Sequence, residues 1–227
     1  MKINLESISY YYLTYNNPTR KEHIEKEFSD YNITEVNPIG NIGKNKSGTS
    51  GFCKILDLAC INQDKNTPFQ PFVIFEDDVK KYRPFPSTID IPDDTDILYI
   101  GLSSWGMKDK NYGENHSVSF TNINKDIIRI YNMLSTHGMM ICSIRGLLTI
   151  QKCMMEALTS NIIWDILTAN IQPYVNVYAL KSPLVYQYKK IGGMEKFTNI
   201  DYMYKSNREF PDSWKKKDFY SIMTFYV

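Results

Sequence analysis

Three consecutive acidic residues, Glu76, Asp77 and Asp78, directly follow an apolar run at residues 72–75. Such a run is typical of a buried strand, and ligand sites in open α/β sheets lie at the carboxyl ends of strands. Adjacent carboxylates repel one another, and Mg²⁺ or Mn²⁺ would offset that repulsion because hard oxygen donors suit these ions. Side chains alternate along a strand, so Glu76 and Asp78 should point one way and Asp77 the other. We interpret the triplet as a metal site; the alternative is a solvated turn with one carboxylate capping a loop.

Asp165 is the candidate for a general base. It follows Trp164 in an apolar segment, and burial there would raise the pKa of its carboxyl group. A base works best when its pKa lies near the operating pH, so a buried aspartate could take the proton of an attacking hydroxyl. The alternative is an aspartate on a helix surface or at a helix cap.

Four more residues are candidates for contacting a ligand. Arg20 lies in a predicted helix and would face a phosphate, and Gln187 would hydrogen-bond substrate. His137, beside Gly138, would line the pocket or act as a third metal ligand. Trp105 lies in a polar loop and would stack on a sugar ring. The structural alternatives are a solvated arginine, a strand-end amide, a hydrogen-bonded histidine and a core tryptophan.

Strands and helices alternate in the first half of the chain, which favours an α/β sandwich around a largely parallel sheet. Residues 37–51 contain four of the 11 glycines and are expected to form a flexible loop, and residues 102–125 a polar one. The other elements follow from apolar periodicity and β-forming residues. Strands are expected at residues 7–15, 33–36, 72–75, 96–101, 127–133, 139–143 and 174–180, and helices at 19–28, 52–61, 144–158 and 162–169.

The composition disfavours several classes of protein. With 227 residues, 43% of them hydrophobic and 22% charged, the chain suits one domain, or one and a half, with a sizeable core. A balance of 26 Lys and Arg against 25 Asp and Glu disfavours a nucleic-acid binder. No apolar run approaches the roughly 18–20 residues of a membrane span, and residues 40–44 fail the Walker pattern. The start of the chain lacks a signal-peptide region and no Cys-x-x-Cys pair is present, so we expect a cytoplasmic protein with reduced thiols.

The order of these features resembles glycosyltransferase family 25, the group of lipooligosaccharide and procollagen galactosyltransferases. Residues 76–79 match the family's Glu-Asp-Asp-Val letter for letter. The opening strand and Arg-bearing helix of the family are similar to residues 10–14 and Arg20, which implies ligand contacts for Thr14 and Arg20. Further matches, in the family's order, are the Gly/Ser-rich segment and helix at residues 47–59, the strand leading to a glycine at 96–101, the Gly/Thr-containing strand and helix at 136–157, Asp165, and Pro-x-x-x-Gln at 183–187.

The resemblance implies a GT-A-like nucleotide-binding sandwich in residues 1–188, with the aromatic and basic residues 189–227 as a lid or docking extension. It implies a hexosyltransferase that uses Mn²⁺ or Mg²⁺ and a nucleotide-sugar donor, most often a UDP-sugar. The sugar, such as galactose or glucose, would pass to a hydroxyl of a glycan or protein acceptor. In an inverting mechanism Asp165 would deprotonate that hydroxyl, while the cation offsets the charge of the departing diphosphate.

One departure from the family pattern leaves other functions open. The family usually carries Ser-His where this chain has Gly51-Phe52, and the chain is short. An inactive relative that serves as a scaffold or carbohydrate-binding protein is one alternative. A nucleotidyltransferase is another, because such enzymes also place carboxylates at strand ends. A transferase releases nucleoside diphosphate, a nucleotidyltransferase releases pyrophosphate, and a binding protein releases neither.

Overall fold

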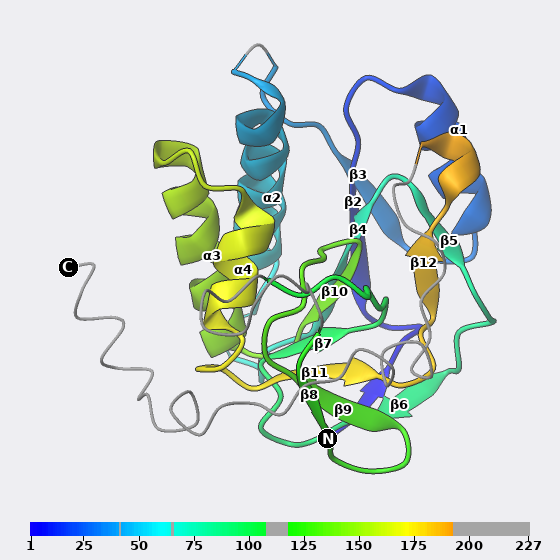
Figure 1. Cartoon of the computed structure of the whole chain (residues 1–227). Coiled ribbons are helices and arrows are strands. Elements are labelled where there is room, and N and C mark those ends of the chain that lie inside the picture. Colours follow the sequence, from blue (N-terminus) through cyan, green and yellow to red (C-terminus); the bar gives the residue numbers. More distant parts are fainter. Residues whose placement is uncertain (41, 65, 108–117, 193–227) are drawn as a thin grey trace.

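An eight-stranded central sheet organises the computed structural model, which describes residues 1–40, 42–64, 66–107 and 118–192 (Figure 1). In order across the sheet, the strands are β3 (Ile33–Val36), β2 (Ser9–Leu13), β4 (Phe72–Glu76), β10 (Gly138–Ile141), β7 (Ile97–Tyr99), β11 (Val177–Leu180), β9 (Ile127–Ile130) and β8 (Phe120–Asn122).

The sheet is mixed. β3, β2 and β4 run parallel to one another, and β7 is parallel to β11. The β4–β10, β10–β7, β11–β9 and β9–β8 pairs are antiparallel. The predicted α/β class is confirmed, but the sheet is only partly parallel, because β10 inserts between β4 and β7 in the opposite direction. The carboxyl ends of β2, β4 and β7 therefore meet the amino end of β10 at one end of the sheet.

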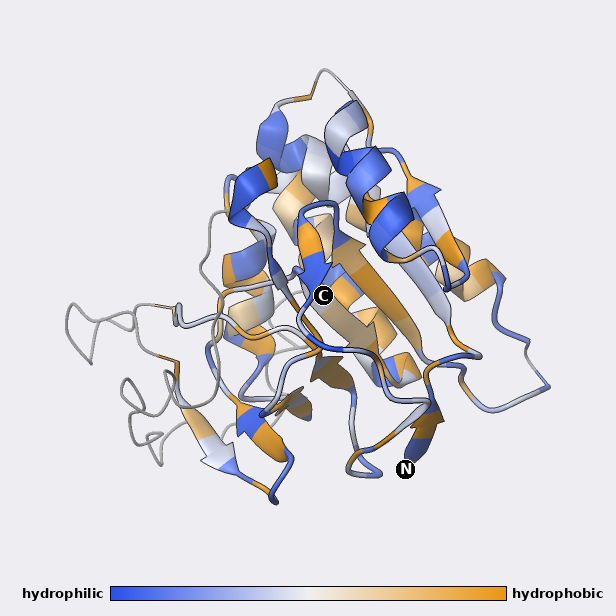
Figure 2. Cartoon of the chain, turned by 90° about the vertical axis from the view of Figure 1, so that its right-hand side faces the viewer, coloured by the Kyte–Doolittle hydropathy of each residue, from blue (hydrophilic) through white to orange (hydrophobic). Residues whose placement is uncertain are grey.

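Helices cover both faces of the sheet, so the central strands are buried on both sides (Figure 1). The helices α2 (Lys44–Ile61), α3 (Ile144–Thr159) and α4 (Trp164–Ile171) lie on one face, and α1 (Pro18–Glu27) lies on the other. A hydrophobic core lies on each face of the sheet, and side chains that alternate along β2 contribute to both. Tyr11 packs in the core that includes α2 and α3 residues, whereas Tyr10 and Tyr12 pack in the core that includes Ile24 of α1. Figure 2 shows hydrophobic residues concentrated on the central strands and hydrophilic residues along α1.

The segment predicted as a glycine-rich loop is the first half of α2. The prediction of a loop at residues 37–51 is therefore wrong from Lys44 onward. Two of its glycines serve close packing instead of chain flexibility. A Cβ atom at Gly51 would lie 1.9 Å from Leu13 Cδ1, and one at Gly48 would lie 2.8 Å from Trp164 Cη2. Glycine lets α2 approach both β2 and α4 more closely than any other residue would allow.

Two small sheets complete the described part of the chain. β1 (Lys2–Asn4) pairs with β6 (Thr88–Asp90), and β5 (Val79–Lys81) pairs with β12 (Val185–Gln187). A short 3₁₀ helix, Lys189–Ile191, follows β12. Most of the predicted extension at residues 189–227 lies outside the described residues, as does the middle of the predicted loop at 102–125, which also contains β8.

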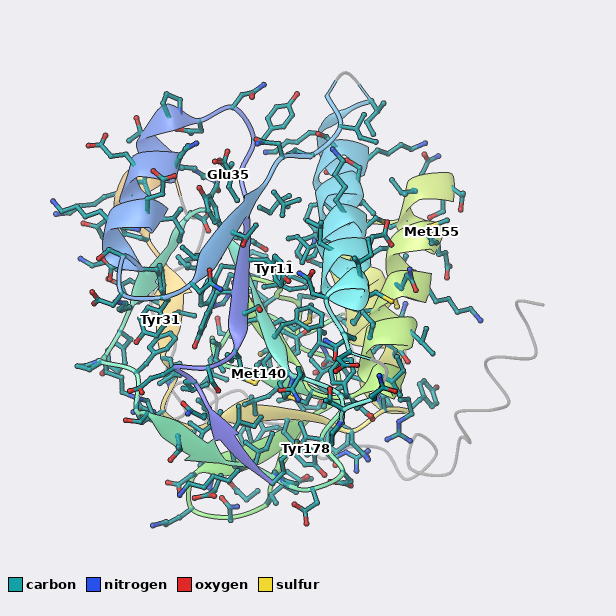
Figure 3. All side chains as sticks on the ribbon, turned by 180° about the vertical axis from the view of Figure 1, so that it is seen from behind. Tyr11, Tyr31, Glu35, Met140, Met155 and Tyr178 are labelled. Atoms are coloured by element: carbon teal, nitrogen blue, oxygen red, sulfur yellow. The ribbon has the colours of Figure 1, made fainter. Side chains whose placement is uncertain are left out.

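Side chains fill the space on both faces of the central sheet (Figure 3). Tyr11 and Met140 lie in the interior, whereas Met155 lies on the outer side of α3 and is 54% exposed. The four cysteines, all within the described ranges, are free. In the described part of the chain, no helix combines the length and the apolar character needed to cross a bilayer.

Candidate functional site

The predicted site residues converge on the end of the sheet where β4 stops. Glu76 is the last residue of β4, and Asp77 and Asp78 form the turn into β5. Leu13 pairs with Glu76 across the parallel β2–β4 interface, which places Thr14 beside the turn. The topology therefore assembles the acidic turn with the ends of neighbouring strands, as expected for a ligand site in an α/β sheet.

β10 brings a second group of polar residues to the same place. It begins at Gly138, which is paired with Phe75, so that Thr136 and His137 come next to Glu76. On the other side of the turn, Gln187 pairs with Val79 in the β5–β12 sheet. This convergence depends on the antiparallel insertion of β10, which the sequence pattern did not indicate.

Arg20 of α1 holds the turn from one face of the sheet. Its Nη1 donates to Asp77 Oδ1 at 2.7 Å, its Nη2 lies 3.5 Å from Asp78 Oδ2, and its Nε donates to the carbonyl of Ile191 at 3.0 Å. A Cβ atom at Gly192 would lie 2.9 Å from Nη2, so this glycine leaves room for the guanidinium. Arg20 thus lies at the acidic turn and contacts carboxylates, and the predicted contact with a phosphate stays a prediction.

Asp78 carries the least satisfied carboxylate of the triplet. The residue is 5% exposed, and its buried Oδ1 atom has no hydrogen-bond partner. Burial raises the pKa of Asp78 and outweighs the opposing effect of the Arg20 guanidinium. A buried, unpartnered carboxylate oxygen is energetically costly, and a bound cation or donor group would remove that cost.

Glu76 faces the opposite side, toward α4. Its Oε1 accepts a hydrogen bond from Thr136 Oγ1 at 2.6 Å, and its Oε2 accepts one from Gln187 Nε2 at 3.0 Å. Burial, with smaller contributions from the negative charges of Asp78 and Asp165, raises the pKa of Glu76 to about 8. The predicted alternation is confirmed for Glu76 and Asp77, which point apart. It is wrong for Asp78, which faces Arg20 together with Asp77, because residues 77 and 78 form a turn and not an extended strand.

Asp165 joins this group from the first turn of α4. Its Oδ1 lies 3.2 Å from Thr136 Oγ1, and the same hydroxyl accepts a hydrogen bond from Trp164 Nε1 at 3.1 Å. Burial raises the pKa of Asp165 to about 6, a value suited to accepting a proton near neutral pH. The role of Asp165 as a general base stays a prediction.

His137 is buried with one ring nitrogen unpartnered. Its Nδ1 is hydrogen-bonded to Ser135 Oγ, whereas Nε2 has no partner. Nε2 lies over Gly101, at the end of β7, where a Cβ atom would be 2.3 Å away. Burial lowers the pKa of His137 to about 4, so the ring is neutral at pH 7. A neutral imidazole in this position suits hydrogen bonding to an uncharged hydroxyl.

Thr14 is buried beside the acidic turn, whereas Trp105 is exposed in a loop. Thr14 is 3% exposed and its Oγ1 has no hydrogen-bond partner. Trp105 is 57% exposed in the loop after β7, and its backbone bonds to Ser103 and Leu134. Three unpartnered buried atoms, on Thr14, Asp78 and His137, thus belong to residues at this end of the sheet. Stacking by Trp105 remains a prediction.

Within the described residues, the acidic turn does not form a closed protein cage for a metal ion. Among the described residues, no three His, Cys, Asp or Glu side chains come together as a metal-binding group. The three predicted carboxylate ligands are divided, since Asp77 is paired with Arg20 and Glu76 is bonded toward α4. Asp78 Oδ1 remains free, and Mg²⁺ is often held by one or two carboxylates together with substrate phosphates. Asp78 is therefore the residue that would hold such an ion.

Thr136 and Trp164 are site residues that sequence reasoning did not assign. Their roles depend on hydrogen bonds between α4 and the amino end of β10, and no local pattern predicts those. The only sequence signal was position, because Thr136 directly precedes His137 and Trp164 directly precedes Asp165.

No protein-family model and no curated protein matches this sequence. Among solved structures, the chain is similar to a nucleoside-diphosphate-sugar pyrophosphorylase from Vibrio cholerae RC9, with 13% sequence identity and a TM-score of 0.39 over 88% of this chain and 82% of that one. None of these comparisons identifies the chain as a member of glycosyltransferase family 25. A likeness this distant supports no conclusion about activity, so function has to be inferred from the geometry of the site.

Proposed function

We propose that this protein is a glycosyltransferase that moves a hexose, such as galactose or glucose, from a UDP-sugar to a hydroxyl of a glycan or protein acceptor. One observation carries the proposal: an unpartnered, buried carboxylate oxygen on Asp78 and a half-buried carboxylate of raised pKa on Asp165 lie at the same end of the sheet, and Glu76 and Thr136 connect them. The first suits charge stabilisation of a departing diphosphate, and the second suits proton removal from an acceptor.

The α1 side of the turn would handle the leaving group. Asp78 Oδ1 would hold Mn²⁺ or Mg²⁺ against the donor, and such an ion acts as a Lewis acid that stabilises negative charge on phosphate oxygens. Arg20, which lies between Asp77 and the carbonyl of Ile191, is a donor that can reach the same phosphates. These residues would bind and orient the diphosphate before the sugar is transferred.

The α4 side would handle the acceptor. Asp165 would take the proton of the acceptor hydroxyl as that oxygen attacks the anomeric carbon, and the bond from that carbon to the diphosphate oxygen would break. Attack from the face opposite the leaving group inverts the configuration of the sugar. His137 Nε2 and Thr14 Oγ1, both buried and unpartnered, would bond hydroxyl groups of the ligand.

The binding step can be tested by measuring the melting temperature with UDP, GDP or CDP, each with Mn²⁺ or with EDTA. A ligand at about 100 times its dissociation constant stabilises by roughly 2.7 kcal/mol, and each kcal/mol raises Tm by about 2–4 °C for a chain of this size. We expect a rise of several degrees with UDP and Mn²⁺ that EDTA abolishes. No shift with any nucleotide would contradict the proposal.

A binding protein without turnover is the second candidate, and one observation favours it. Arg20 already pairs with Asp77 and lies near Asp78, so the acidic turn has a positively charged partner within the chain itself. Such a protein would bind nucleotide or sugar and release no phosphate product. A nucleotidyltransferase would instead release pyrophosphate, so product identity separates all three functions.

A further inference from the structure

The hydroxyl of Thr136 lies at the centre of the carboxylate pair on the α4 side. The residue is 1% exposed, and its Oγ1 lies 2.6 Å from Glu76 Oε1, 3.2 Å from Asp165 Oδ1 and 3.1 Å from Trp164 Nε1. Three side chains from two elements other than its own therefore meet at one buried oxygen.

The directions of these hydrogen bonds follow from the chemistry of the groups. An indole N–H can only donate, so Thr136 accepts from Trp164. A threonine hydroxyl has one proton to give, and the 2.6 Å contact to Glu76 is the shorter of its two carboxylate contacts. Both carboxylate oxygens lie within hydrogen-bond distance of that hydroxyl, so Thr136 links Asp165 to Glu76, and the other lone pairs of Asp165 remain available for another proton.

We infer that Thr136 is a positioning residue that, together with the Trp164 indole, fixes the carboxylate of Asp165 for proton removal from the acceptor. This inference rests on the proposed function and adds to it a residue outside the predicted catalytic and metal-binding set. Thr136 touches neither donor nor acceptor in this account. It acts through Asp165.

Trp164 is itself held in place by α2. A Cβ atom at Gly48 would lie 2.8 Å from Cη2 of the indole, and the ring centroids of Phe52 and Trp164 are 5.8 Å apart. The ring therefore cannot shift toward α2, and it keeps its N–H directed at Thr136. Adding a methyl group at Gly48 would push the indole without changing any polar group of the site.

The first experiment compares Thr136→Val, Thr136→Ser and the control Thr95→Val. Thr95 is also buried, and its hydroxyl bonds the carbonyl of Pro92 at the opposite end of β7. We expect Thr136→Val to lower kcat by about 10–100-fold, the usual effect of removing a group that orients a reactive one, with KM for the donor unchanged. Thr136→Ser keeps the hydroxyl and should stay within about threefold of wild type, as should Thr95→Val.

A second pair of variants tests the same hydrogen bonds through Trp164. Gly48→Ala should lower kcat and change the tryptophan emission spectrum, whereas Gly40→Ala should do neither, because a Cβ atom at Gly40 meets nothing within 4 Å. Thr136→Val should also change the emission, since Trp164 loses its acceptor, and Thr136→Ser should not.

Three results would overturn the inference. The first is wild-type kcat in a folded Thr136→Val variant. The second is an equal loss in Thr136→Ser, which keeps the hydroxyl. The third is absence of transfer by the wild-type protein, which would remove the proposed function and this role with it. Difference emission spectra between each variant and wild type distinguish the cases. The emission of Trp105 and Trp214 should be common to all the proteins, so the difference reports the surroundings of Trp164 whether or not the protein turns over.

Discussion

The carboxylates on the two sides of the turn after β4 have different partners. On the α1 side, Asp77 and Asp78 face the guanidinium of Arg20. On the α4 side, Glu76 accepts hydrogen bonds from the Thr136 hydroxyl and the Gln187 amide, and Asp165 lies beside the same hydroxyl. A few residues of one turn therefore lie in two electrostatic environments.

This difference suggests how a single acidic segment can support two kinds of chemistry. On the α1 side, the Arg20 guanidinium opposes the effect of burial on the pKa of Asp78. The carboxylates there suit the binding of a cation, and Arg20 suits the binding of phosphate. A buried carboxyl group that has only neutral partners has a raised pKa, as Glu76 and Asp165 do, and suits proton transfer. The predictions below are ordered from the largest expected effect to the smallest.

Loss of the Asp78 carboxylate, on the α1 side of the turn, should have the largest effect on the rate of sugar transfer. Asp78→Asn removes the charge that would hold the metal, and we expect transfer to fall by more than about 10³-fold, because charge stabilisation of the leaving group is lost. Steady-state assays with Mn²⁺ would measure it. Because the fold should remain intact, the circular dichroism spectrum should match wild type. Unchanged activity would exclude Asp78 as the metal ligand.

Loss of the base on the α4 side should slow turnover and also change its pH dependence. Asp165→Asn should lower kcat by roughly 10²–10⁴-fold. The base acts only when deprotonated, so wild-type kcat/KM should rise with pH through about 6, the pKa of Asp165. The residual activity of the variant should lack that acidic limb. If kcat falls by less than tenfold, or if kcat/KM of the variant still rises with pH through about 6, another residue is the base.

Removing the positive charge of Arg20, on the α1 side of the turn, should reduce the stability of the folded protein. Arg20→Gln leaves two buried carboxylates without their partner, and we expect Tm to fall by about 4–8 °C, or roughly 2 kcal/mol, since Arg20 is partly exposed. Added Mn²⁺ should restore more stability to this variant than to wild type. Lys21→Gln is the control, because Lys21 pairs with Glu35 nearer the surface of α1 and its loss should cost less. Equal effects in the two variants would contradict the comparison.

Replacing Glu76 by a neutral residue should have the smallest effect of the four substitutions, and it should raise Tm where Arg20→Gln lowers it. Because the pKa of Glu76 is raised to about 8, the folded protein retains a proton that the unfolded chain loses near its ordinary value. Stability should therefore fall as pH rises from about 4.5 to 8. In EDTA, Glu76→Gln should raise Tm at pH 8 and change it little at pH 5, whereas Glu22→Gln, on the surface of α1, should change Tm at neither pH. A Glu76→Gln variant that melts lower than wild type at pH 8 would show that the carboxylate is stabilising.

The acidic side of the site could be predicted from sequence, whereas its neutral side could not. An apolar strand that ends in three acids is a local pattern, and it placed Glu76, Asp77 and Asp78 correctly at the carboxyl end of β4. The part played by Thr136 depends on β10 running antiparallel beside β4, which is a long-range pairing. Local periodicity carries no information about such pairing.

Glycine gave the most misleading local signal. The glycines of residues 37–51 predicted a loop, yet Gly48 and Gly51 lie inside α2, where they allow close packing against Trp164 and Leu13. Tertiary contacts outweigh the low helix propensity of glycine at these positions. The close approach of α2 is also what holds the Trp164 indole against Thr136, so the failed prediction falls on a segment that shapes the site.

The most direct test of the central claim is the phosphate product formed from a nucleotide sugar. The protein would be incubated with UDP-glucose or UDP-galactose and Mn²⁺, with water as the acceptor, and the products separated by ion-exchange chromatography. We predict slow release of UDP and free sugar, abolished by EDTA and by Asp78→Asn. Release of pyrophosphate only when UTP and a sugar phosphate are supplied, or no product at all despite UDP binding, would contradict a glycosyltransferase.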